Sequence, residues 1–273
     1  MVEIQLVQRI INVMTGKKIT IKQIAKEAGV STATVSYVLN DRKDQKISDA
    51  AKKKILQIAN LYHYSVNPAA KSLVTGHCNS VAVYIQSSDS LLRLADAFII
   101  ISRLSEAFHA AGINVDLTPD TDTSQAQNVD GIICVGTKKE LFRKIANNNF
   151  VPVIAIDTII RDPLFHEIID DYSLFSGKTM LTLPLSSESY EQYLSGHFHL
   201  VTINKAGDID RYFQENQGQD TYIRNNSVKN YCSEKGYHPI LLDSWTQEKT
   251  NRIVDFFKDI TADKADIPNQ IKL

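Results

Sequence analysis

The sequence of 273 residues predicts an α/β protein in which a small all-helical unit precedes a doubly wound core with a shortened second subdomain. Three short helical patterns separated by tight turns occupy residues 20–62. From about Asn79 onward, apolar runs typical of buried strands alternate with amphipathic helical patterns, which favours a parallel sheet covered by helices. At roughly 100–200 residues per domain, the length also favours two domains.

The composition excludes several classes of protein. A hydrophobic fraction of 43% and a charged fraction of 22% are those of a globular chain. The most apolar stretch, residues 91–101, is broken by Arg93 and Asp96 and is shorter than the ~18 residues that span a bilayer. The first residues, MVEIQLVQ, lack the basic and apolar regions of a secretory signal. We therefore expect a cytoplasmic protein with no membrane partner.

The sequence offers no metal or catalytic motif. Cys78, Cys134 and Cys232 are odd in number, far apart and without C-x-x-C spacing, which argues against a disulfide framework or a zinc site. The seven histidines give no ligand spacing, and there is no G-x-S-x-G, P-loop or G-x-G-x-x-G motif. We expect neither an enzyme nor a cofactor.

The net charge of −1 hides an asymmetry along the chain. Residues 1–77 contain twelve Lys and Arg against five Asp and Glu, a balance of +7, so residues 78–273 carry −8. A basic first quarter on an acidic body indicates that the first part meets a polyanion and the rest does not. Charge alone would favour a solvated basic surface over a polyanion-binding one, but the motifs below add to the charge signal.

Capping signals divide residues 20–62 into three helices. Thr20 and Gln23 match a capping box, Gly29 suits a left-handed helix stop, and Ser31 and Ser48 are placed to cap the second and third helices. The second helix turns its apolar residues toward the other two: Val35, Val38 and Leu39. Two short helices joined by a tight turn and braced by a third form a helix-turn-helix.

Three strings in this region resemble the headpiece and hinge of the LacI/GalR family of bacterial repressors. They are the Ala-Gly-Val-Ser turn, the helix Thr-Val-Ser-x-Val-Leu-Asn, and the hinge Tyr-x-x-Asn-x-x-Ala-x-x-Leu, all in the order and spacing of the family. The resemblance implies a helix-turn-helix domain at residues 18–65, a hinge at 66–78, and an effector-binding and dimerisation core like a periplasmic binding protein at 79–273. Residues 1–17 form an N-terminal extension, which is either an appendage or a packing helix.

The resemblance and the chemistry of base readout together give the candidate DNA-binding residues. The second helix would enter the major groove, where its outer face presents Thr32, Ala33 and Tyr37 to bases. Tyr37 could instead pack on the headpiece surface. Short polar groups suited to phosphates surround these three residues, and Thr20 stands at the start of the preceding helix. The candidate phosphate-binding residues are Thr20, Ser31, Thr34, Ser36 and Asn40.

The hinge would act on the minor groove. Asn67 can cap a hinge helix, Ala70 allows close approach to a second backbone, Lys71 would contact the DNA backbone, and Leu73 stands where relatives wedge the central base step apart. Such a wedge needs two hinges side by side, so the resemblance implies a homodimer on a near-palindromic, double-stranded operator. Alternatively, Leu73 lies in a linker and packs on the core, and this packing is compatible with the wedging role.

The core shows two departures from the family pattern. We expect strands and helices at residues 81–85, 91–110, 113–117, 131–135, 138–146, 152–156 and 199–203. A polar stretch at 118–128 replaces the helix expected after the second strand. The chain also stops near Leu273, so we expect the second subdomain to be incomplete and its crossover back to the first to be missing.

The candidate effector site follows the strand ends, where open α/β cores bind ligands. Thr137 and Asp157 follow the third and fourth strands, and the resemblance adds Asp171 at the subdomain crossover and Arg224 opening a helix. Carboxylates together with a planar cation suit the hydroxyls of a sugar, although Asp157 would serve as well in a helix cap or a surface turn.

We therefore predict a nucleoid-associated, sequence-specific transcriptional regulator, most simply a repressor, that a small sugar-like effector controls. The first alternative is a DNA-binding regulator whose truncated core no longer senses a ligand. A solute-binding protein would be favoured by a secretion signal and a sugar-processing enzyme by a catalytic motif, and the sequence shows neither.

Overall fold

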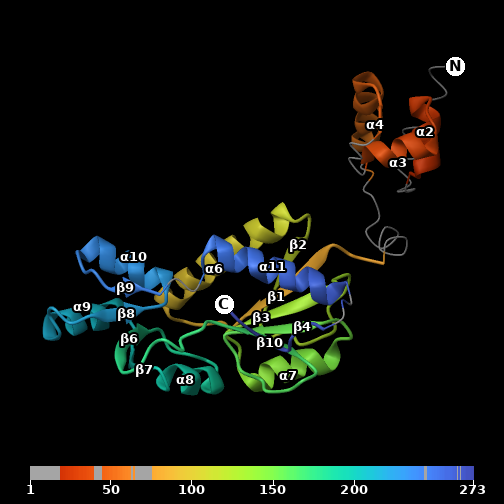
Figure 1. The fold of residues 1–273 in the computed structure, drawn as a ribbon. Coiled ribbons are helices and arrows are strands. Elements are labelled where there is room, and N and C mark those ends of the chain that lie inside the picture. The colour runs from red at the N-terminus through yellow and green to blue at the C-terminus, as the bar shows by residue number, and fades with distance from the viewer. Residues whose placement is uncertain are drawn as a thin grey trace. The chain divides into compact units, whose positions relative to one another are not determined.

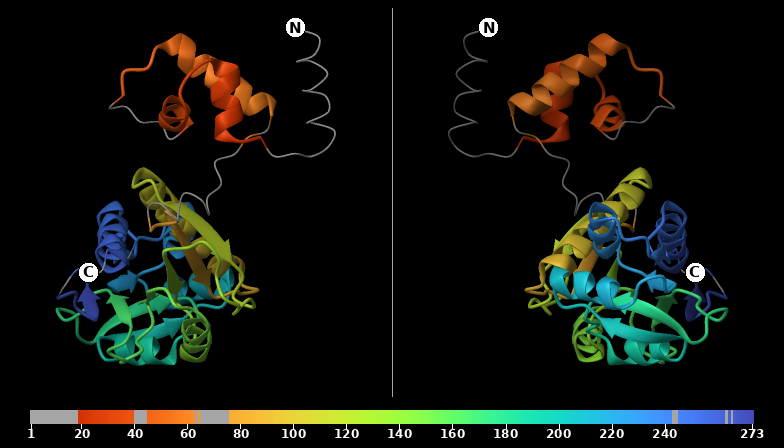
Figure 2. Two further views of the ribbon diagram at one scale, coloured as in Figure 1. Left: turned by 90° about the vertical axis from the view of Figure 1, so that its right-hand side faces the viewer. Right: turned by 90° about the vertical axis from the view of Figure 1, so that its left-hand side faces the viewer.

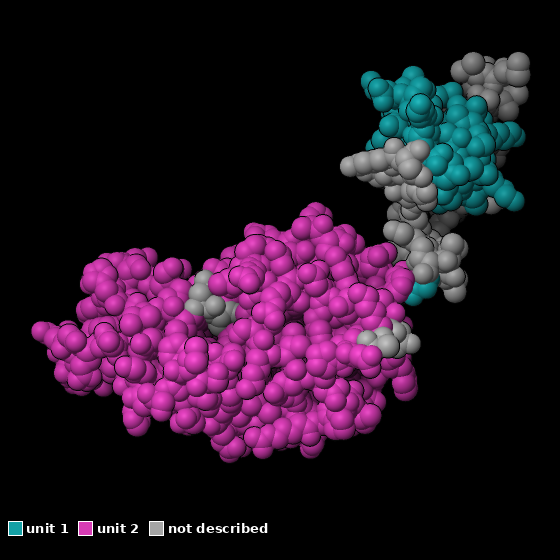
Figure 3. Space-filling model, in the orientation of Figure 1, with its two compact units in different colours: residues 1–76 teal, residues 77–273 magenta. Residues whose placement is uncertain are grey.

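The computed structural model describes residues 19–39, 45–62, 64, 76–242, 245–262, 264 and 266–273. The chain divides into two compact units, Met1–Gly76 and His77–Leu273, which Figure 3 shows in different colours. Each unit has a hydrophobic core of its own, and each is described by itself.

The first unit packs three helices around a small core (Figure 1): α2 (Ile21–Ala28), α3 (Thr32–Leu39) and α4 (Asp49–Leu61). The fully buried residues Ile24, Val35 and Ile55 contribute one side chain from each helix. The predicted capping box is confirmed, because Thr20 N donates to Gln23 Oε1 at 2.9 Å and Gln23 N donates to Thr20 Oγ1 at 3.4 Å. 

The turns of this unit also follow the predicted chemistry. Gly29 ends α2 in the left-handed region, at φ 74°, where a residue with a Cβ would be strained. Ser31 accepts from Thr34 N at 3.0 Å, and Ser48 accepts from Ala51 N at 3.3 Å. These caps begin α3 and α4 at fixed points and so set the angle at which α3 is presented.

The second unit contains two parallel sheets. The larger has the order β10-β5-β4-β3-β1-β2 and is formed by β1 (Ser80–Ile85), β2 (Asn114–Thr118), β3 (Gly131–Val135), β4 (Val153–Ile156), β5 (His166–Ile169) and β10 (Gln270–Lys272). Helices α6 (Leu91–Ala110) and α11 (Gln247–Thr261) cover one face, and α7 (Lys139–Asn148) covers the other (Figures 1 and 2).

Alternation along the strands decides which helix each side chain meets. Val81 and Val83 pack against α6 and α11, whereas Ala82 and Tyr84 face α7. Both faces are therefore apolar, which is why β1 and β3 are unbroken hydrophobic runs in the sequence.

The smaller sheet repeats this arrangement with fewer strands. Its order is β7-β6-β8-β9, with β6 (Lys178–Thr182), β7 (Phe198–Thr202), β8 (Thr221–Ile223) and β9 (Ile240–Leu241). Helices α9 (Ala206–Glu215) and α10 (Asn226–Lys235) pack on one face and α8 (Glu188–Ser195) on the other. The predicted fold class, a helical headpiece followed by a doubly wound core with a smaller second sheet, is confirmed.

The chain crosses between the two sheets twice. It leaves the larger sheet after β5 and returns through α11, and β10 then pairs in parallel with β5, with Ile271 opposite Ile168. Our expectation that the return crossover is missing is therefore wrong. Burial explains the return, because Ile253, Val254 and Phe257 of α11 complete the core over the larger sheet.

The other departure, the missing helix after the second strand, is confirmed. The connection between β2 and β3 contains no helix, as the polar stretch at residues 118–128 predicts. It is anchored by side chains: Asn149 Oδ1 accepts from Ala126 N at 2.8 Å, and Asn148 donates to Thr123 O at 2.6 Å.

Candidate functional site

Helix α3 turns one side to its neighbours and the other to solvent. Val35 is fully buried against α2 and α4, whereas Thr32 and Ala33 are exposed at the start of the helix. At 100° per residue, Ala33 and the half-buried Tyr37 lie about 200° around the helix from Val35 and so on its opposite side. Thr32 lies about 60° from Val35 and is exposed in the first turn. This is the geometry by which a recognition helix presents its first residues to base edges.

The short polar side chains of this region are partly engaged with one another. Ser31 and Thr34 share a hydroxyl–hydroxyl hydrogen bond of 2.8 Å while Ser31 caps the helix, and Thr20 is held by Gln23. Ser36 is half-buried. The remaining predicted DNA-binding residues lie outside the described part of the chain: Asn40, Asn67, Ala70, Lys71 and Leu73.

Exposed lysines flank α3 on the other two helices. Lys22 and Lys26 lie on α2, and Lys52, Lys53 and Lys54 form a run on α4. Ammonium groups of this kind neutralise phosphates without selecting a sequence, so they complement the exposed face of α3.

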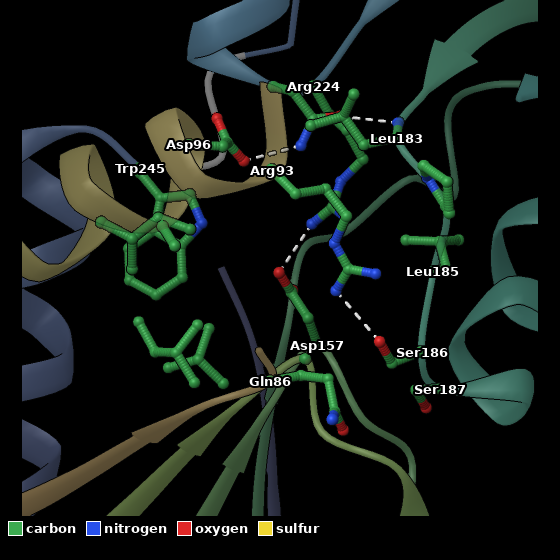
Figure 4. A pocket seen from close by; sticks show the side chains of 17 residues that line it. Gln86, Arg93, Asp96, Asp157, Leu183, Leu185, Ser186, Ser187, Arg224 and Trp245 are labelled. Atoms are coloured by element: carbon green, nitrogen blue, oxygen red, sulfur yellow. Dashed lines mark hydrogen bonds and ion pairs between the residues drawn. The ribbon is translucent and has the colours of Figure 1, made fainter. Parts of the chain in front are cut away.

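The second unit contains a cavity of about 80 Å³ between its two sheets (Figure 4). The polar residues that line it come from the loops after strands or from the first turns of α6: Gln86, Arg93, Asp96, Asp157, Ser186, Ser187, Arg224 and Asn225. Trp245 and several aliphatic side chains close the rest of the wall. Because parallel strands end at one edge, the loops of both sheets meet here.

A buried ionic cluster adjoins this cavity. Arg224 Nη2 lies 2.6 Å from Asp157 Oδ2 and 4.0 Å from Asp170 Oδ2, and Lys249 Nζ lies 2.5 Å from Asp170 Oδ1. All four side chains are at least nine-tenths buried. Tyr190 lies under the Arg224 guanidinium at 5.0 Å. The cluster joins the ends of β4 and β5 to β8 and α11, so it ties the two sheets together.

The cations of this cluster stabilise the ionised form of Asp157. Burial alone would raise the pKa of Asp157, but the adjacent Arg224 and Lys249 outweigh it and hold that pKa below its ordinary value. Asp157 is therefore ionised, and its partner keeps the pair neutral as a whole. An ion pair of this kind survives burial only with such close geometry and additional contacts.

The structure brings two of the four predicted effector residues to the cavity. Asp157 and Arg224 line it and contact each other. Thr137 is fully buried but does not line the cavity, and its backbone carbonyl accepts from Thr158 Oγ1 at 2.9 Å.

Asp171, which the resemblance suggested for the effector site, lies apart from the buried ionic cluster. Its neighbour Asp170 belongs to that cluster instead. The Asp171 side chain is exposed and accepts from Ser173 N at 3.0 Å, whereas its backbone N–H donates to Leu273 O. Successive side chains of an extended segment point to opposite sides, so only one of two neighbouring aspartates can face inward.

Sequence reasoning missed the polar lining from α6 and the Asn225 side chain that precedes α10. Asp96 is buried and accepts from Asn225 Nδ2 at 2.7 Å and from Ser227 N at 3.3 Å. Arg93 Nη2 donates to Ser186 Oγ at 3.0 Å. The available signal was the interruption of an apolar helix by two charges, which indicates a polar partner for that face.

Comparison with known proteins identifies the first unit. Residues 20–67 match the family described as "Bacterial regulatory proteins, lacI family". These residues form a LacI-family helix-turn-helix domain. The α2–α3 pair and its capped turn are therefore the helix-turn-helix of that family.

Curated relatives of this chain are transcriptional regulators by name. The repressor PurR of Edwardsiella ictaluri is 27% identical over 171 residues, which cover 58% of this chain and 48% of the repressor. Catabolite control protein A of Staphylococcus aureus is 28% identical over 163 residues, 57% of this chain and 49% of that protein. The chain thus spans about half the length of these curated relatives.

Solved structures agree on the fold. The Lac repressor dimer bound to operator and to the anti-inducer ONPF superposes with a TM-score of 0.58, covering 94% of this chain and 96% of the repressor chain at 17% identity. The second unit is therefore an α/β core of the kind found in LacI-family regulators.

The described residues contain no group of three or more His, Cys, Asp and Glu that could hold a metal ion. In the same part of the chain, no helix combines the length and the apolar character needed to cross a membrane.

Proposed function

We propose that this chain is a sequence-specific, DNA-binding transcriptional regulator, most simply a repressor, that acts on double-stranded operators at the bacterial nucleoid in the cytoplasm. The observation that carries this proposal is the LacI-type domain whose α3 buries Val35 and exposes Ala33 on the opposite side, with Thr32 exposed in the first turn. The names of the relatives, the HTH-type transcriptional repressor PurR and catabolite control protein A, support the same activity.

Within this proposal, each element of the first unit has a role on DNA. Thr32, Ala33 and Tyr37 read base edges in the major groove, while Ser31, Thr34, Ser36 and the helix N-terminus contact phosphates. The exposed lysines of α2 and α4 add sequence-independent affinity. Asn40 and the hinge residues Asn67, Ala70, Lys71 and Leu73 keep the roles that the sequence suggests.

The chain acts as a homodimer in this proposal, and α6 offers a surface for it. Leu91, Leu94 and Phe98 follow one another at helical spacing and are 82%, 50% and 70% exposed. An exposed apolar stripe on a long helix marks an interface, and two copies related by a two-fold axis can bury the same stripe against each other. A near-palindromic operator then meets two equivalent headpieces.

The core would sense a small sugar-like effector in the cavity between the sheets. Asp157 and Arg224 offer a carboxylate and a guanidinium there, and Asn225 adds an amide. One observation favours the alternative of a core that senses nothing: Asp157 and Arg224 are already paired with each other at 2.6 Å. A ligand must therefore compete for groups that are partly satisfied.

The test is genomic footprinting with the purified chain, followed by a gel shift on the sequence recovered. We expect a near-palindromic consensus for the wild type and for Ala262→Glu, an exposed position of the second unit. Ala33→Glu places a negative charge on the exposed face of α3 and is expected to abolish the footprint. A wild-type chain that returns no consensus, or an Ala33→Glu chain that returns the same one, would contradict the proposal.

The effector is tested separately, by screening sugars for release of the recovered operator. Release by a sugar supports a sensing core. A chain that holds its operator against the whole screen supports the alternative in which the core no longer senses a ligand.

A further inference from the structure

Arg93 reaches into the cavity from the first turn of α6. Its side chain is half-buried, and Nη2 donates to Ser186 Oγ at 3.0 Å on the far wall, after the end of β6 (Figure 4). The guanidinium has five N–H donors in a planar fork, and the Ser186 hydroxyl accepts from one of them.

The other charges that line the cavity have partners of their own. Asp157 pairs with Arg224 at 2.6 Å, and Asp96 accepts from the Asn225 side chain and from Ser227 N. Among the described residues, no carboxylate lies within ion-pair distance of Arg93. Asp96, one turn further along α6, attracts Arg93 from a distance without contacting it.

Partial burial makes the charged form of the Arg93 guanidinium less stable. Loss of water lowers the pKa of Arg93, and the attraction of Asp96 opposes that effect without cancelling it. A guanidinium that is drawn out of water without a carboxylate partner is unfavourable, and a bound anion would supply the missing partner.

We propose that the effector taken by this cavity is an anion, namely a small sugar-like molecule that carries an oxyanion, either a carboxylate or a phosphate. Arg93 and the Ser186 hydroxyl hold the oxyanion, and the hydroxyls of the ligand face the Asp157–Arg224 pair and Asn225. This inference rests on the proposed function only in assuming that the cavity holds an effector.

Three features of the site fit an oxyanion. The guanidinium fork matches a carboxylate or phosphate with two parallel hydrogen bonds. Ser187, beside Ser186, is the N-cap of α8, and the positive end of that helix favours negative charge. The cavity, of about 80 Å³, has room for an oxyanion of the size of phosphate.

The first experiment measures the thermal midpoint of the full chain against inorganic phosphate, with sodium chloride added to keep the ionic strength constant. We expect a saturable rise for the wild type, and an apparent affinity at least about tenfold weaker for Arg93→Gln, which removes a charge-assisted contact. Arg211→Gln makes the same change at an exposed position of α9 outside the cavity, and it should behave as the wild type.

Ser186→Ala is a second variant that leaves Arg93 in place, and it should weaken the phosphate response by a smaller factor. It keeps the test valid if Arg93→Gln fails to fold. Equal responses of the wild type, Arg93→Gln and Ser186→Ala would overturn the proposal, as would the absence of any response in the wild type.

The second experiment separates the two oxyanions by comparing ribose 5-phosphate with ribose, and gluconate with sorbitol. A response to the phosphate alone supports a sugar phosphate, and a response to gluconate alone supports a sugar acid. A neutral sugar that raises the thermal midpoint of the wild type and of Arg93→Gln equally would overturn the proposal of an anionic ligand. It would not contradict the proposed DNA-binding function. Failure of operator binding overturns the proposed function but leaves the phosphate result to stand.

Discussion

Asp157 and Arg224 show how single residues join the two halves of the core. The pair lies 2.6 Å apart, comes from two different sheets, and is almost wholly buried. Removing one partner leaves the other charge buried without compensation, and that cost usually exceeds the net worth of the pair. The Arg224 side chain also lies over Tyr190, so the surrounding packing depends on its position.

Asp157→Asn should therefore lower the free energy of unfolding by about 3 kcal/mol. Chemical denaturation followed by circular dichroism measures the loss. Asp171→Asn removes a carboxylate of the same kind at an exposed position and should leave the stability near that of the wild type. Equal losses of unfolding free energy in both variants would show that burial of the Asp157–Arg224 pair does not determine what the pair contributes to stability.

Tyr37 offers a residue-scale test of base reading. Its phenol cannot make the bidentate contact that a guanidinium makes with guanine, so Tyr37→Arg should shift the operator preference toward guanine at one symmetric pair of positions. The expected discrimination is about 1–3 kcal/mol for each contact, measured by selection from randomised operators. An unchanged consensus would mean that residue 37 packs on the headpiece and does not read bases.

Among the elements, α6 has the largest number of separate roles. Ile100, Leu104 and Phe108 bury one side against the larger sheet, and Asp96 binds the start of α10. Its first turns expose Leu91, Leu94 and Phe98, while Arg93 points into the cavity. A helix that lines the cavity and carries the proposed dimer surface can couple the two sites, because a shift of α6 changes both.

Phe98→Glu should convert the dimer to a monomer, since it places a charge in the middle of the apolar stripe. Sedimentation velocity over a range of protein concentrations measures the change. Leu174→Glu makes an equivalent change at a residue that is 95% exposed and lies off α6. A Phe98→Glu chain that stays dimeric would place the interface elsewhere.

Over the whole molecule, charge is divided between the two units. The first 77 residues carry +7 and the rest carry −8, so DNA attracts one end of the chain and repels the other. We expect this division to orient the protein as it approaches DNA, with the acidic second unit repelled by the phosphate backbone.

Operator affinity should accordingly fall steeply with salt. Each phosphate that the headpiece neutralises contributes about −0.9 to the slope of the logarithm of the binding constant against the logarithm of salt concentration. A gel-shift titration of the full chain from low to moderate salt gives this slope. Affinity that does not depend on salt would contradict the assignment of the basic unit to DNA.

Much of the local structure was predictable, because its causes lie within a few residues of sequence. The capping box at Thr20, the stop at Gly29, and the helix at Leu91–Ala110 all form as predicted. The strands β1 and β3 were predictable for the same reason, since burial on both faces requires unbroken apolar runs. The headpiece, in which contacts are close in sequence, was thus read almost entirely from its pattern.

The core depended on contacts between distant residues, which no local pattern encodes. Only the tertiary structure shows that Asp170 faces inward and Asp171 outward, and that Arg93 and Asp96 line a cavity with residues more than ninety positions away. Likewise, the sequence placed the return crossover beyond Leu273, but burial of α11 and the pairing of β10 with β5 bring the chain back within its length. The sequence by itself determined the three helices of the first unit, α6, α7, and the strands β1 to β4 and β7, because periodicity and capping are local. The kind of DNA-binding domain followed from the resemblance of its motifs to a known family. The partners of each buried charge were decided by the tertiary structure, because a charge in the core is stabilised by whichever groups the fold brings to it.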